Sequence, residues 1–536
     1  MEFHNMTTFT RAKSTLALTI LTLLAILAPN VSAQEYATNP ILYADVPDVS
    51  VLRVGDDYYM SSTTNHMAPG VPVMHSKNLV DWNIISYAYD VLEVNDKQEL
   101  RAGKNAYGDG SWASSLRYHD GVFYLVTFSQ TTGKTHVYTT RDPAGKWEAK
   151  SFEPMCHDCS LFFDDDDRVY LLYGGGDLRL TELKSDLSGF KTGGLDKIVV
   201  HNASDVAGGA VGLRAEGSQV FKRNGKYYIT NITWPRGDMR TQIIHRADSI
   251  EGPYEGRVFI KDRGIAQGTI FEGADGQWYA CLFQDSGAMG RMPYLTTVDW
   301  IDDWPVPSGD GKFPRTLPIK HEQGARPLGN IVGDDEFSNP DALADTLTMG
   351  PWQWNHNPDF ENWSLKERPG WLRIKTARVD QTLTQARNTL TQRTFGPTSS
   401  ATTSLDPRGL KDGDVAGLVL LQRRYGYVGV TRRDGKLFVV QAQADERTDK
   451  LTENVLIPLD GEPESIQLRA KCDFRDLRDL AEFSWSADGV NWETIGETLH
   501  MVYSIPQFIG YRFALFCRSA QQPGAVADFD FFHSGQ

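Results

Sequence analysis

Along most of the chain, apolar and polar residues alternate with a period of two, and turn-forming residues interrupt the alternation at short intervals. Glycine, aspartate, asparagine or proline stands at most of these breaks. The alternating runs are rich in β-branched and aromatic residues, and the 3.6-residue period of an amphipathic helix is nearly absent. This pattern predicts an all-β protein.

Five segments share one pattern, in which an apolar run stops at a polar turn and resumes with aromatic residues. They are 53–60 (RVGDDYYM), 117–125 (RYHDGVFYL), 163–173 (FDDDDRVYLLY), 221–230 (FKRNGKYYIT) and 272–283 (EGADGQWYACLF). Their central tyrosines are Tyr59, Tyr124, Tyr170, Tyr228 and Tyr279. The positions 11 or 12 residues before these tyrosines, called the in-phase positions, hold Asp48, Trp112, Asp158, Glu216 and Gln267.

A second aromatic follows each of the first four copies. Trp82 and Trp147 each lie 23 residues after the tyrosine of their copy, and looser versions end at Phe190 and Tyr254. One unit therefore has four short strands: one at the in-phase position, the aromatic strand, a third strand, and an edge strand closed by an aromatic. Repeats of this size and strand count are typical of propeller blades. We expect five blades between about residues 39 and 323.

The chain then changes character. Residues 302–327 are rich in glycine, proline and charge, and they predict a linker lying against the surface. New alternating runs begin at Asp334, and an Asp-Gly pair in 483–492 predicts a strand–turn–strand unit. About 200 residues of this kind predict a β-sandwich. We place the propeller at 34–325 and the sandwich at 330–536.

The first 33 residues predict a secretory signal peptide. Arg11 and Lys13 precede an apolar run at 16–28, and small residues at 31–33 form a cleavage site. A run of 13 residues is short for a membrane span, which needs roughly 20. We therefore expect an exported protein, periplasmic or extracellular, without membrane attachment after cleavage.

The charge of the chain narrows the choice of partner. The 536 residues carry a net charge of −15, and without the first 33 residues 52 basic and 68 acidic residues remain. An acidic surface repels phosphate backbones, so nucleic acid is not an expected partner. A neutral oligosaccharide or polysaccharide fits better. Thirteen tryptophans and 21 tyrosines suit stacking on sugar rings, although most such residues serve only as core.

The five cysteines are few and odd in number, so the fold does not depend on a disulfide framework. The sequence Cys156-His157-Asp158-Cys159 resembles a redox or zinc motif. However, no βαβ pattern surrounds it and no second such motif pairs with it. Small apolar filling beside Asp158 is the interpretation we favour.

The three acids among the in-phase positions predict an active site. The first strand of each propeller blade lines the central axis, so Asp48, Asp158 and Glu216 should converge, with Trp112 and Gln267 completing the ring. Facing carboxylates without basic partners raise the pKa of at least one of them, which suits acid/base chemistry. Glycosidic cleavage uses such a pair: one protonated acid and one ionised carboxylate. A single aspartate after a strand is usually a turn residue, but three acids in phase favour catalysis.

Three motifs, in order, resemble those of glycoside hydrolase family 43. They are Pro47-Asp48-Val49-Ser50 (after Asn39-Pro40-Ile41-Leu42), His157–Asp164 and Ala215-Glu216-Gly217. The resemblance continues through Gly287–Arg291 and Trp352–Asn355 and covers nearly the whole chain after the leader. It implies a five-bladed propeller with β-xylosidase, α-L-arabinofuranosidase or arabinanase activity, followed by a concanavalin-like sandwich.

The resemblance also implies roles for these residues. Asp48 corresponds to the general base that activates water, Glu216 to the general acid, and Asp158 to the residue that tunes and orients that acid. The family inverts the anomeric configuration, which implies carboxylates roughly 6.5–9.5 Å apart. The candidate substrate-binding residues are Arg291, Trp112 and Gln267. Arg291 could instead form a surface salt bridge, and Trp112 could instead serve ordinary packing.

The chain departs from the family pattern at three positions. Val49 replaces a proline of the first motif, and Ser114 replaces a proline of the second blade. Gln267 stands near the place where many members carry a histidine, often a calcium ligand. Glutamine is the poorer ligand, so we expect no metal in the catalytic channel and no cofactor for catalysis. Similar appended domains imply a structural calcium at Glu336 and Asp528, with solvated surface acids as the alternative.

The leading hypothesis is an exo-acting glycosidase that removes terminal xylose or arabinofuranose from plant cell-wall glycans. One alternative is a secreted carbohydrate-binding propeller whose acids only hydrogen-bond sugar hydroxyls. Another is an endo-arabinanase, which requires an open groove across the ring.

Overall fold

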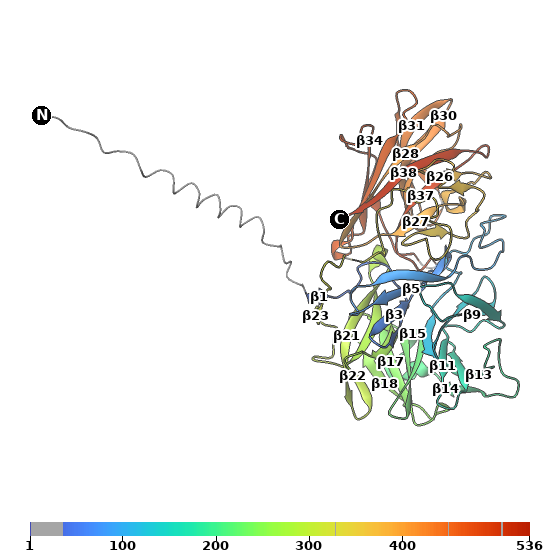
Figure 1. Cartoon of the computed structure of the whole chain (residues 1–536), viewed down its shortest axis with the longest axis vertical. Coiled ribbons are helices and arrows are strands. Elements are labelled where there is room, and N and C mark those ends of the chain that lie inside the picture. The colour runs from blue at the N-terminus through green and yellow to red at the C-terminus, as the bar shows by residue number, and fades with distance from the viewer. Residues whose placement is uncertain (2–35, 327, 449, 505–506) are drawn as a thin grey trace.

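The computed structural model describes residues 1, 36–326, 328–448, 450–504 and 507–536. Its regular elements are β-strands and four short 3-10 turns, so the all-β prediction is confirmed for these residues. The predicted signal peptide lies outside them, apart from Met1. Across the described residues, no helix has the length and apolar character needed to cross a membrane. Figure 1 shows two bodies stacked along the long axis, one blue to yellow and one orange to red.

The first body consists of five four-stranded antiparallel sheets, as the repeats predicted. Blade 1 contains β2 (Ser50–Val54), β3 (Asp57–Ser61), β5 (Gly70–Ser76) and β6 (Asn83–Tyr89). Blade 2 contains β7 (Ser115–His119), β8 (Val122–Ser129), β9 (Lys134–Thr140) and β10 (Glu148–Phe152). Blade 3 contains β11 (Ser160–Phe163), β12 (Val169–Tyr173), β13 (Leu178–Leu183) and β14 (Asp196–Val200). Blade 4 contains β15 (Val211–Arg223), β16 (Lys226–Pro235), β17 (Thr241–Ala247) and β18 (Glu255–Ile260), and blade 5 contains β19 (Ala266–Glu272), β20 (Trp278–Asp285), β21 (Arg291–Ile301) and β22 (Trp304–Pro307).

Two eight-stranded sheets form the second body, the β-sandwich. The first runs in the order β32 (Leu451–Pro458), β31 (Lys436–Ala444), β30 (Gly426–Arg433), β29 (Val415–Leu421), β37 (Arg512–Arg518), β27 (Leu390–Arg393), β24 (Gln353–Asn355), β4 (Met67–Ala68). The second runs β25 (Trp363–Ser364), β26 (Leu372–Lys375), β38 (Val526–Gly535), β28 (Thr398–Asp406), β33 (Ile466–Asp473), β34 (Leu480–Ser486), β35 (Glu493–Thr494), with β36 (Leu499–His500) also paired to β34. The 3-10 turns are η1 (Ala203–Ala207), η2 (Gly287–Met289), η3 (Leu383–Gln385) and η4 (Arg475–Leu477).

The two bodies are joined by more than a covalent connection. Strand β4 leaves blade 1 and pairs with β24 of the sandwich, with Ala68 opposite Trp354 and Met67 opposite Asn355. One hydrophobic core also includes residues of both bodies, such as Leu295 and Phe513. The sandwich is therefore held in a defined position against one face of the propeller.

Two details differ from the sequence-based expectations. The second aromatic of each unit does not close the edge strand: Trp82 and Trp147 immediately precede β6 and β10. The predicted linker at 302–327 also contributes strands. It supplies β22 as the edge of blade 5 and β23 (Thr316–Lys320), which pairs with β1 (Tyr36–Thr38).

Hydroxyl side chains join the innermost strands of neighbouring blades. In each case a serine or threonine two or three residues after an in-phase position accepts a hydrogen bond from a backbone N–H of the next inner strand. The pairs are Ser50 with Leu116 (3.0 Å), Ser115 with Leu161 (3.0 Å), Ser160 with Val220 (3.0 Å) and Thr269 with Val51 (3.1 Å). We call these four bonds the hydroxyl belt. Because they set the height of one inner strand against the next, they place the in-phase positions at one level of the axis.

Removing one belt hydroxyl should destabilise the protein. The Oγ of Ser160 accepts hydrogen bonds from the Val220 N–H at 3.0 Å and from Nη2 of Arg117 at 2.8 Å. Ser160→Ala leaves these donors without that acceptor, and we expect a loss of about 1–3 kcal/mol in chemical denaturation. Ser185→Ala, at an exposed position of blade 3, should change stability by less than about 0.5 kcal/mol. Equal stability of the two variants would contradict a role for the belt.

Candidate active site

All five in-phase residues line one cavity of about 500 Å³. It lies where the inner strands begin, on the propeller face that meets the sandwich, because Tyr503 and Phe508 of the sandwich also line it. The structure therefore brings together the candidate catalytic residues Asp48, Asp158 and Glu216. It also brings the three candidate substrate-binding residues to the same cavity: Trp112, Gln267 and Arg291.

The backbone is turned sharply at three of the in-phase positions. Asp48 (φ 52°), Asp158 (φ 47°) and Gln267 (φ 58°) have left-handed conformations, which residues other than glycine rarely adopt. Each stands at or just before the start of its inner strand. Unfavourable conformations of this kind cluster at functional sites, where the surrounding structure holds them.

Asp48 has a cationic partner, contrary to the expectation of carboxylates without basic neighbours. Nη1 of Arg291 donates to Oδ1 of Asp48 at 2.8 Å, and the two side chains are only 5% and 2% exposed. Burial lowers the pKa of Arg291, but the attraction of Asp48, together with that of Tyr503, Asp45 and Asp285, outweighs burial and the net shift is upward.

Arg291 does not contact Asp48 alone. Its Nη2 donates to the carbonyl of Phe508 in the sandwich at 2.7 Å. Its backbone N–H donates to Oδ1 of Asp45 at 2.7 Å, and Oδ2 of Asp45 accepts from the Gly510 N–H at 2.9 Å. The predicted alternative of a surface salt bridge is wrong, since this ion pair is buried and lines the cavity.

Glu216 is reached from the cavity, and its side chain is 25% exposed. Oδ2 of Asp158 accepts a hydrogen bond from the N–H of Gly217 at 2.8 Å, so Asp158 holds the backbone directly after Glu216. Gly217 has φ 63°, and a Cβ there would lie 2.6 Å from Cδ of Gln267. Glycine is required at this position for both reasons, and Gln267 thereby packs on the backbone that carries Glu216.

His157 is the residue that the sequence argument missed. Its Nε2 lies 3.0 Å from Oε2 of Glu216 and 3.9 Å from Oδ2 of Asp158. The ring packs edge-on against Phe128, with centroids 5.1 Å apart. Burial lowers the pKa of His157, but the hydrogen bond to Glu216 and the charges of both acids raise it to about 9. The sequence signal that could have identified His157 is its position directly before the in-phase acid Asp158. The left-handed turn at Asp158 lets both side chains approach Glu216.

Asp158 is buried next to other charged groups. Burial raises the pKa of Asp158, and the neighbouring carboxylates Glu216 and Asp48 raise it as well against the opposing effect of His157, so that the net pKa is about 7. The three acids therefore differ in what they contact: a guanidinium beside Asp48, an imidazole beside Glu216, and the Gly217 N–H beside Asp158.

The sandwich supplies one wall of the cavity. Phe508 meets Trp112 edge-on, with ring centroids 5.0 Å apart, and Tyr503 lies in the same wall. These two residues were also missed, because nothing in the alternation of the sandwich strands distinguishes a loop that returns to the propeller. Trp112 both packs on Phe508 and lines the cavity, so its two interpretations are not exclusive.

The predicted calcium ligands Glu336 and Asp528 are each paired with basic side chains. Both oxygens of Asp528 are bonded to Arg373, and Oδ2 also accepts from Arg368, while Glu336 pairs with His533. Neither acid belongs to a group of three potential metal ligands among the described residues. The one such group in the described chain has ligand atoms within 4.8 Å of one another. It consists of His157, Asp158 and Glu216.

The cysteines fill the core, in agreement with the interpretation favoured from the sequence. All five are free and buried. Cys156 and Cys159 belong to the apolar cluster between blades 2 and 3. Burial raises the pKa of the Cys156 thiol to about 11.

Comparison with known proteins identifies both bodies. The model of glycosyl hydrolases family 43 matches residues 37–305, and that of the beta-xylosidase C-terminal concanavalin A-like domain matches residues 335–534. A beta-xylosidase of Formosa agariphila is 28% identical, over 92% of this chain and 89% of that protein. A non-reducing end alpha-L-arabinofuranosidase of Bacteroides ovatus is 30% identical, over 78% of this chain and 80% of that protein.

A solved structure is closer in sequence than these two relatives. A bifunctional GH43-CE protein of Bacteroides eggerthii is 51% identical and superposes with a TM-score of 0.90 over 94% of this chain. The present chain spans 64% of the length of that protein.

The contact between His157 and the acids should appear in the pH dependence of stability. The raised pKa means that protonated His157 contributes stability that is fully present below about pH 6.5 and is lost as the pH rises through about 9. At pH 6, His157→Gln should therefore unfold at a lower temperature than wild type, by an amount equivalent to about 1 kcal/mol, since solvent screens a side chain that is 39% exposed. At pH 9.5 the difference should shrink. His500→Gln, at an exposed site, is the control, and a pH-independent effect of His157→Gln would refute the assignment.

Proposed function

The chain belongs to glycosyl hydrolases family 43, and we propose that it is an exo-acting, inverting hydrolase that releases terminal xylose or arabinofuranose from plant cell-wall glycans. The observation that carries the proposal is the convergence of Asp48, Asp158 and Glu216 on one cavity, each with a different charged or apolar neighbour.

The arrangement suits a single displacement. Asp48, paired with Arg291, accepts a proton from a water molecule, and the water oxygen bonds to the anomeric carbon as the glycosidic bond breaks. Glu216 donates its proton to the departing oxygen. Asp158 acts through the Gly217 N–H and His157 rather than on the substrate. Two carboxyl groups and water suffice for this chemistry, so the proposal includes no cofactor.

The shape of the cavity supports release of terminal residues. The sandwich residues Tyr503 and Phe508 close one side of a cavity of about 500 Å³, in the range of small-ligand sites. An endo-acting enzyme needs a groove open at both ends, and this wall opposes one. The hydrogen bond from Arg291 to the Phe508 carbonyl holds the wall in place.

The proposed substrates include both pentoses, xylose and arabinofuranose. The named relatives include a beta-xylosidase and a non-reducing end alpha-L-arabinofuranosidase. Trp112 offers an aromatic wall, and Arg240 and Gln130 offer hydrogen-bonding groups to sugar hydroxyls. Nothing in this set separates a xylose ring from an arabinofuranose ring, so we propose activity toward both.

We also propose that the mature protein is exported. The support is the sequence of the first 33 residues, in which basic residues, an apolar run and small residues follow in the order of a signal peptide. Polymeric cell-wall glycans or their fragments are then accessible to it.

Replacing the general acid tests the function directly. Glu216→Gln keeps the shape of the side chain but has no proton to donate, so kcat on natural xylan-derived oligosaccharides should fall by about 10²–10⁴. The assay compares nitrophenyl β-xyloside, nitrophenyl α-arabinofuranoside and xylo-oligosaccharides. Glu497→Gln, on the exposed surface of the sandwich, should leave every rate unchanged. If wild type cleaves none of these substrates but still binds glycan, the chain is a binding protein and the hydrolase proposal fails.

The stereochemistry of the product tests the roles of Asp48 and Glu216. An inverting enzyme acting on a β-xyloside releases α-xylose first, because water attacks from the face opposite the leaving group. Proton NMR of the reaction in its first minutes should show this anomer before mutarotation. Initial release of the β-anomer would mean a covalent intermediate, which contradicts Asp48 as general base.

A further inference from the structure

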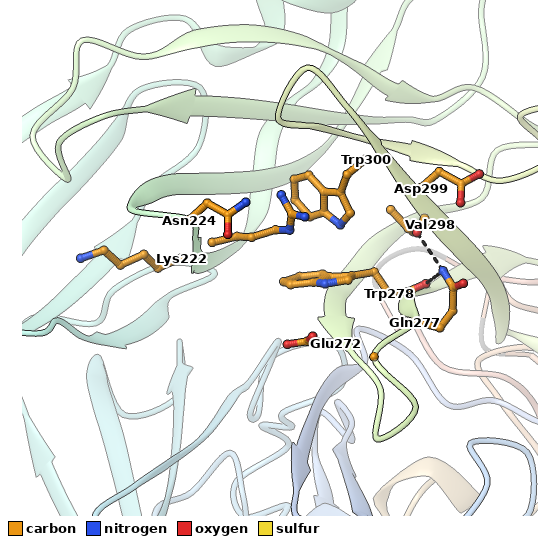
Figure 2. Close-up of a pocket in the computed structure, with 10 residues that line it drawn as sticks. Lys222, Asn224, Glu272, Gln277, Trp278, Val298, Asp299 and Trp300 are labelled. Atoms are coloured by element: carbon orange, nitrogen blue, oxygen red, sulfur yellow. Dashed lines mark hydrogen bonds between the residues drawn. The ribbon is translucent and has the colours of Figure 1, made fainter.

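The propeller is also hollowed at the end of its axis that faces away from the catalytic cavity. A cavity of about 370 Å³ is lined there by the last residues of all five inner strands. A neighbouring cavity of about 540 Å³ lies between blades 4 and 5 (Figure 2). The two share Lys222, Glu272 and Trp278. They therefore form one continuous depression, the distal groove, defined here by Tyr118, Lys222, Asn224, Glu272, Trp278 and Trp300.

The distal groove is separate from the catalytic cavity. Strand β15 connects the two, and the eight residues from Glu216 to Arg223 span about 20 Å in extended conformation. The half-buried side chain of Arg117 crosses the axis at the inner end of the cavity of about 370 Å³. It donates hydrogen bonds to Ser160 Oγ (2.8 Å), Gln219 Oε1 (2.9 Å) and the Leu161 carbonyl (2.8 Å). A ligand in the groove therefore cannot be the sugar that is being cleaved.

Aromatic rings border the groove on several sides. The rings of Trp278 and Trp300 are nearly perpendicular, with centroids 5.0 Å apart. Figure 2 shows the Trp278 ring between Trp300 and the carboxylate of Glu272. Because Trp278 lines both cavities, its ring has hollow space on more than one side. Tyr118, 43% exposed, adds a further ring.

The polar side chains of the groove are available for a ligand. Asn224 and Glu272 are exposed, and no hydrogen bond or ion pair inside the described chain engages their side-chain atoms. Lys222, by contrast, is held by Asp164 and Asp165, and Arg223 packs over Trp300 at 4.0 Å. The free groups thus include a neutral amide and a carboxylate beside aromatic rings.

This combination fits a neutral carbohydrate. The C–H face of a sugar packs on an aromatic ring, while its hydroxyls donate to a carboxylate and exchange hydrogen bonds with an amide. The lysine and arginine side chains of the lining are already engaged: Lys222 pairs with Asp164 and Asp165, Arg223 packs over Trp300, and Arg53 and Arg117 donate hydrogen bonds within the protein. The carboxylates of Glu272 and Asp299 are not engaged within the described residues, and with the net charge of −15 they oppose polyanions. We propose that the distal groove binds a second stretch of the neutral polysaccharide whose chain ends the catalytic cavity cleaves. The class of this glycan rests on the proposed function.

Such a site would act by retaining the enzyme on its polymer. Occupation of two separated sites raises the effective concentration of chain ends at the catalytic cavity without changing the chemical step. Its loss should therefore lower activity on polymeric substrate and leave activity on small substrates intact.

Affinity electrophoresis tests the proposal. The full chain carrying Glu216→Gln is run through native gels with and without soluble arabinoxylan, alone and combined with Trp278→Ala. We expect Trp278→Ala to weaken retardation at least fivefold. In the otherwise unaltered enzyme, it should keep nitrophenyl β-xyloside hydrolysis within twofold. Trp492→Ala is the matched control, since Trp492 is a half-buried sandwich tryptophan that also packs under an arginine, Arg469 at 3.5 Å.

A second variant tests the proposal if Trp278→Ala does not fold. If the melting temperature of Trp278→Ala falls strongly, Asn224→Ala with Glu272→Gln removes only exposed polar groups and should still weaken retardation. Unchanged retardation in this double variant and in a folded Trp278→Ala would overturn the proposal, as would an equal effect of Trp492→Ala.

The outcomes for the two proposals are distinguishable. Retardation that depends on Trp278 in a protein that cleaves no nitrophenyl glycoside would support the groove and refute the hydrolase. Cleavage by a protein whose retardation is absent or independent of Trp278 would refute the groove and leave the hydrolase standing.

Discussion

The hydroxyl belt is the constraint on which the site depends. In the described part of the chain, each propeller blade is a separate antiparallel sheet, and no strand pairing joins the inner strand of one blade to that of the next. The height of each inner strand is therefore set by contacts between strands, and the buried hydroxyls of Ser50, Ser115, Ser160 and Thr269 supply directional ones. Because buried N–H groups without acceptors are costly, slippage of one blade is opposed. Acids from distant parts of the chain are thereby held at one level.

The ion pair of Asp48 and Arg291 links this ring to the second body. Asp48 precedes the first strand of blade 1, Arg291 begins β21 of blade 5, and the same guanidinium reaches the Phe508 carbonyl in the sandwich. One buried side chain thus contacts the first blade, the last blade and the sandwich. The sandwich is part of the catalytic cavity for this reason, and its position is further held by the β4–β24 pairing.

The chemistry follows from giving similar carboxyl groups different neighbours. A guanidinium donates a hydrogen bond to Asp48, while Glu216 shares a hydrogen bond with the imidazole of His157. Asp158 is buried, its pKa is raised to about 7, and it bonds the backbone next to Glu216 instead of facing solvent. The proposed separation of base, acid and positioning residue therefore rests on the surroundings, as expected when one residue type performs several roles.

The sequence by itself determined the all-β class, the five blades and the five in-phase positions. These rest on local rules: period-two alternation, turn residues and the spacing from each tyrosine. It also indicated which acids meet, because a repeat places equivalent residues at equivalent heights. Only the tertiary structure decided that Arg291 pairs with Asp48, that His157 contacts Glu216, and that Phe508 closes the cavity. Residues 48 and 291 or 112 and 508 share no repeat phase, and their contact depends on how the ring closes and where the sandwich docks. Those are long-range packing outcomes that no local pattern records.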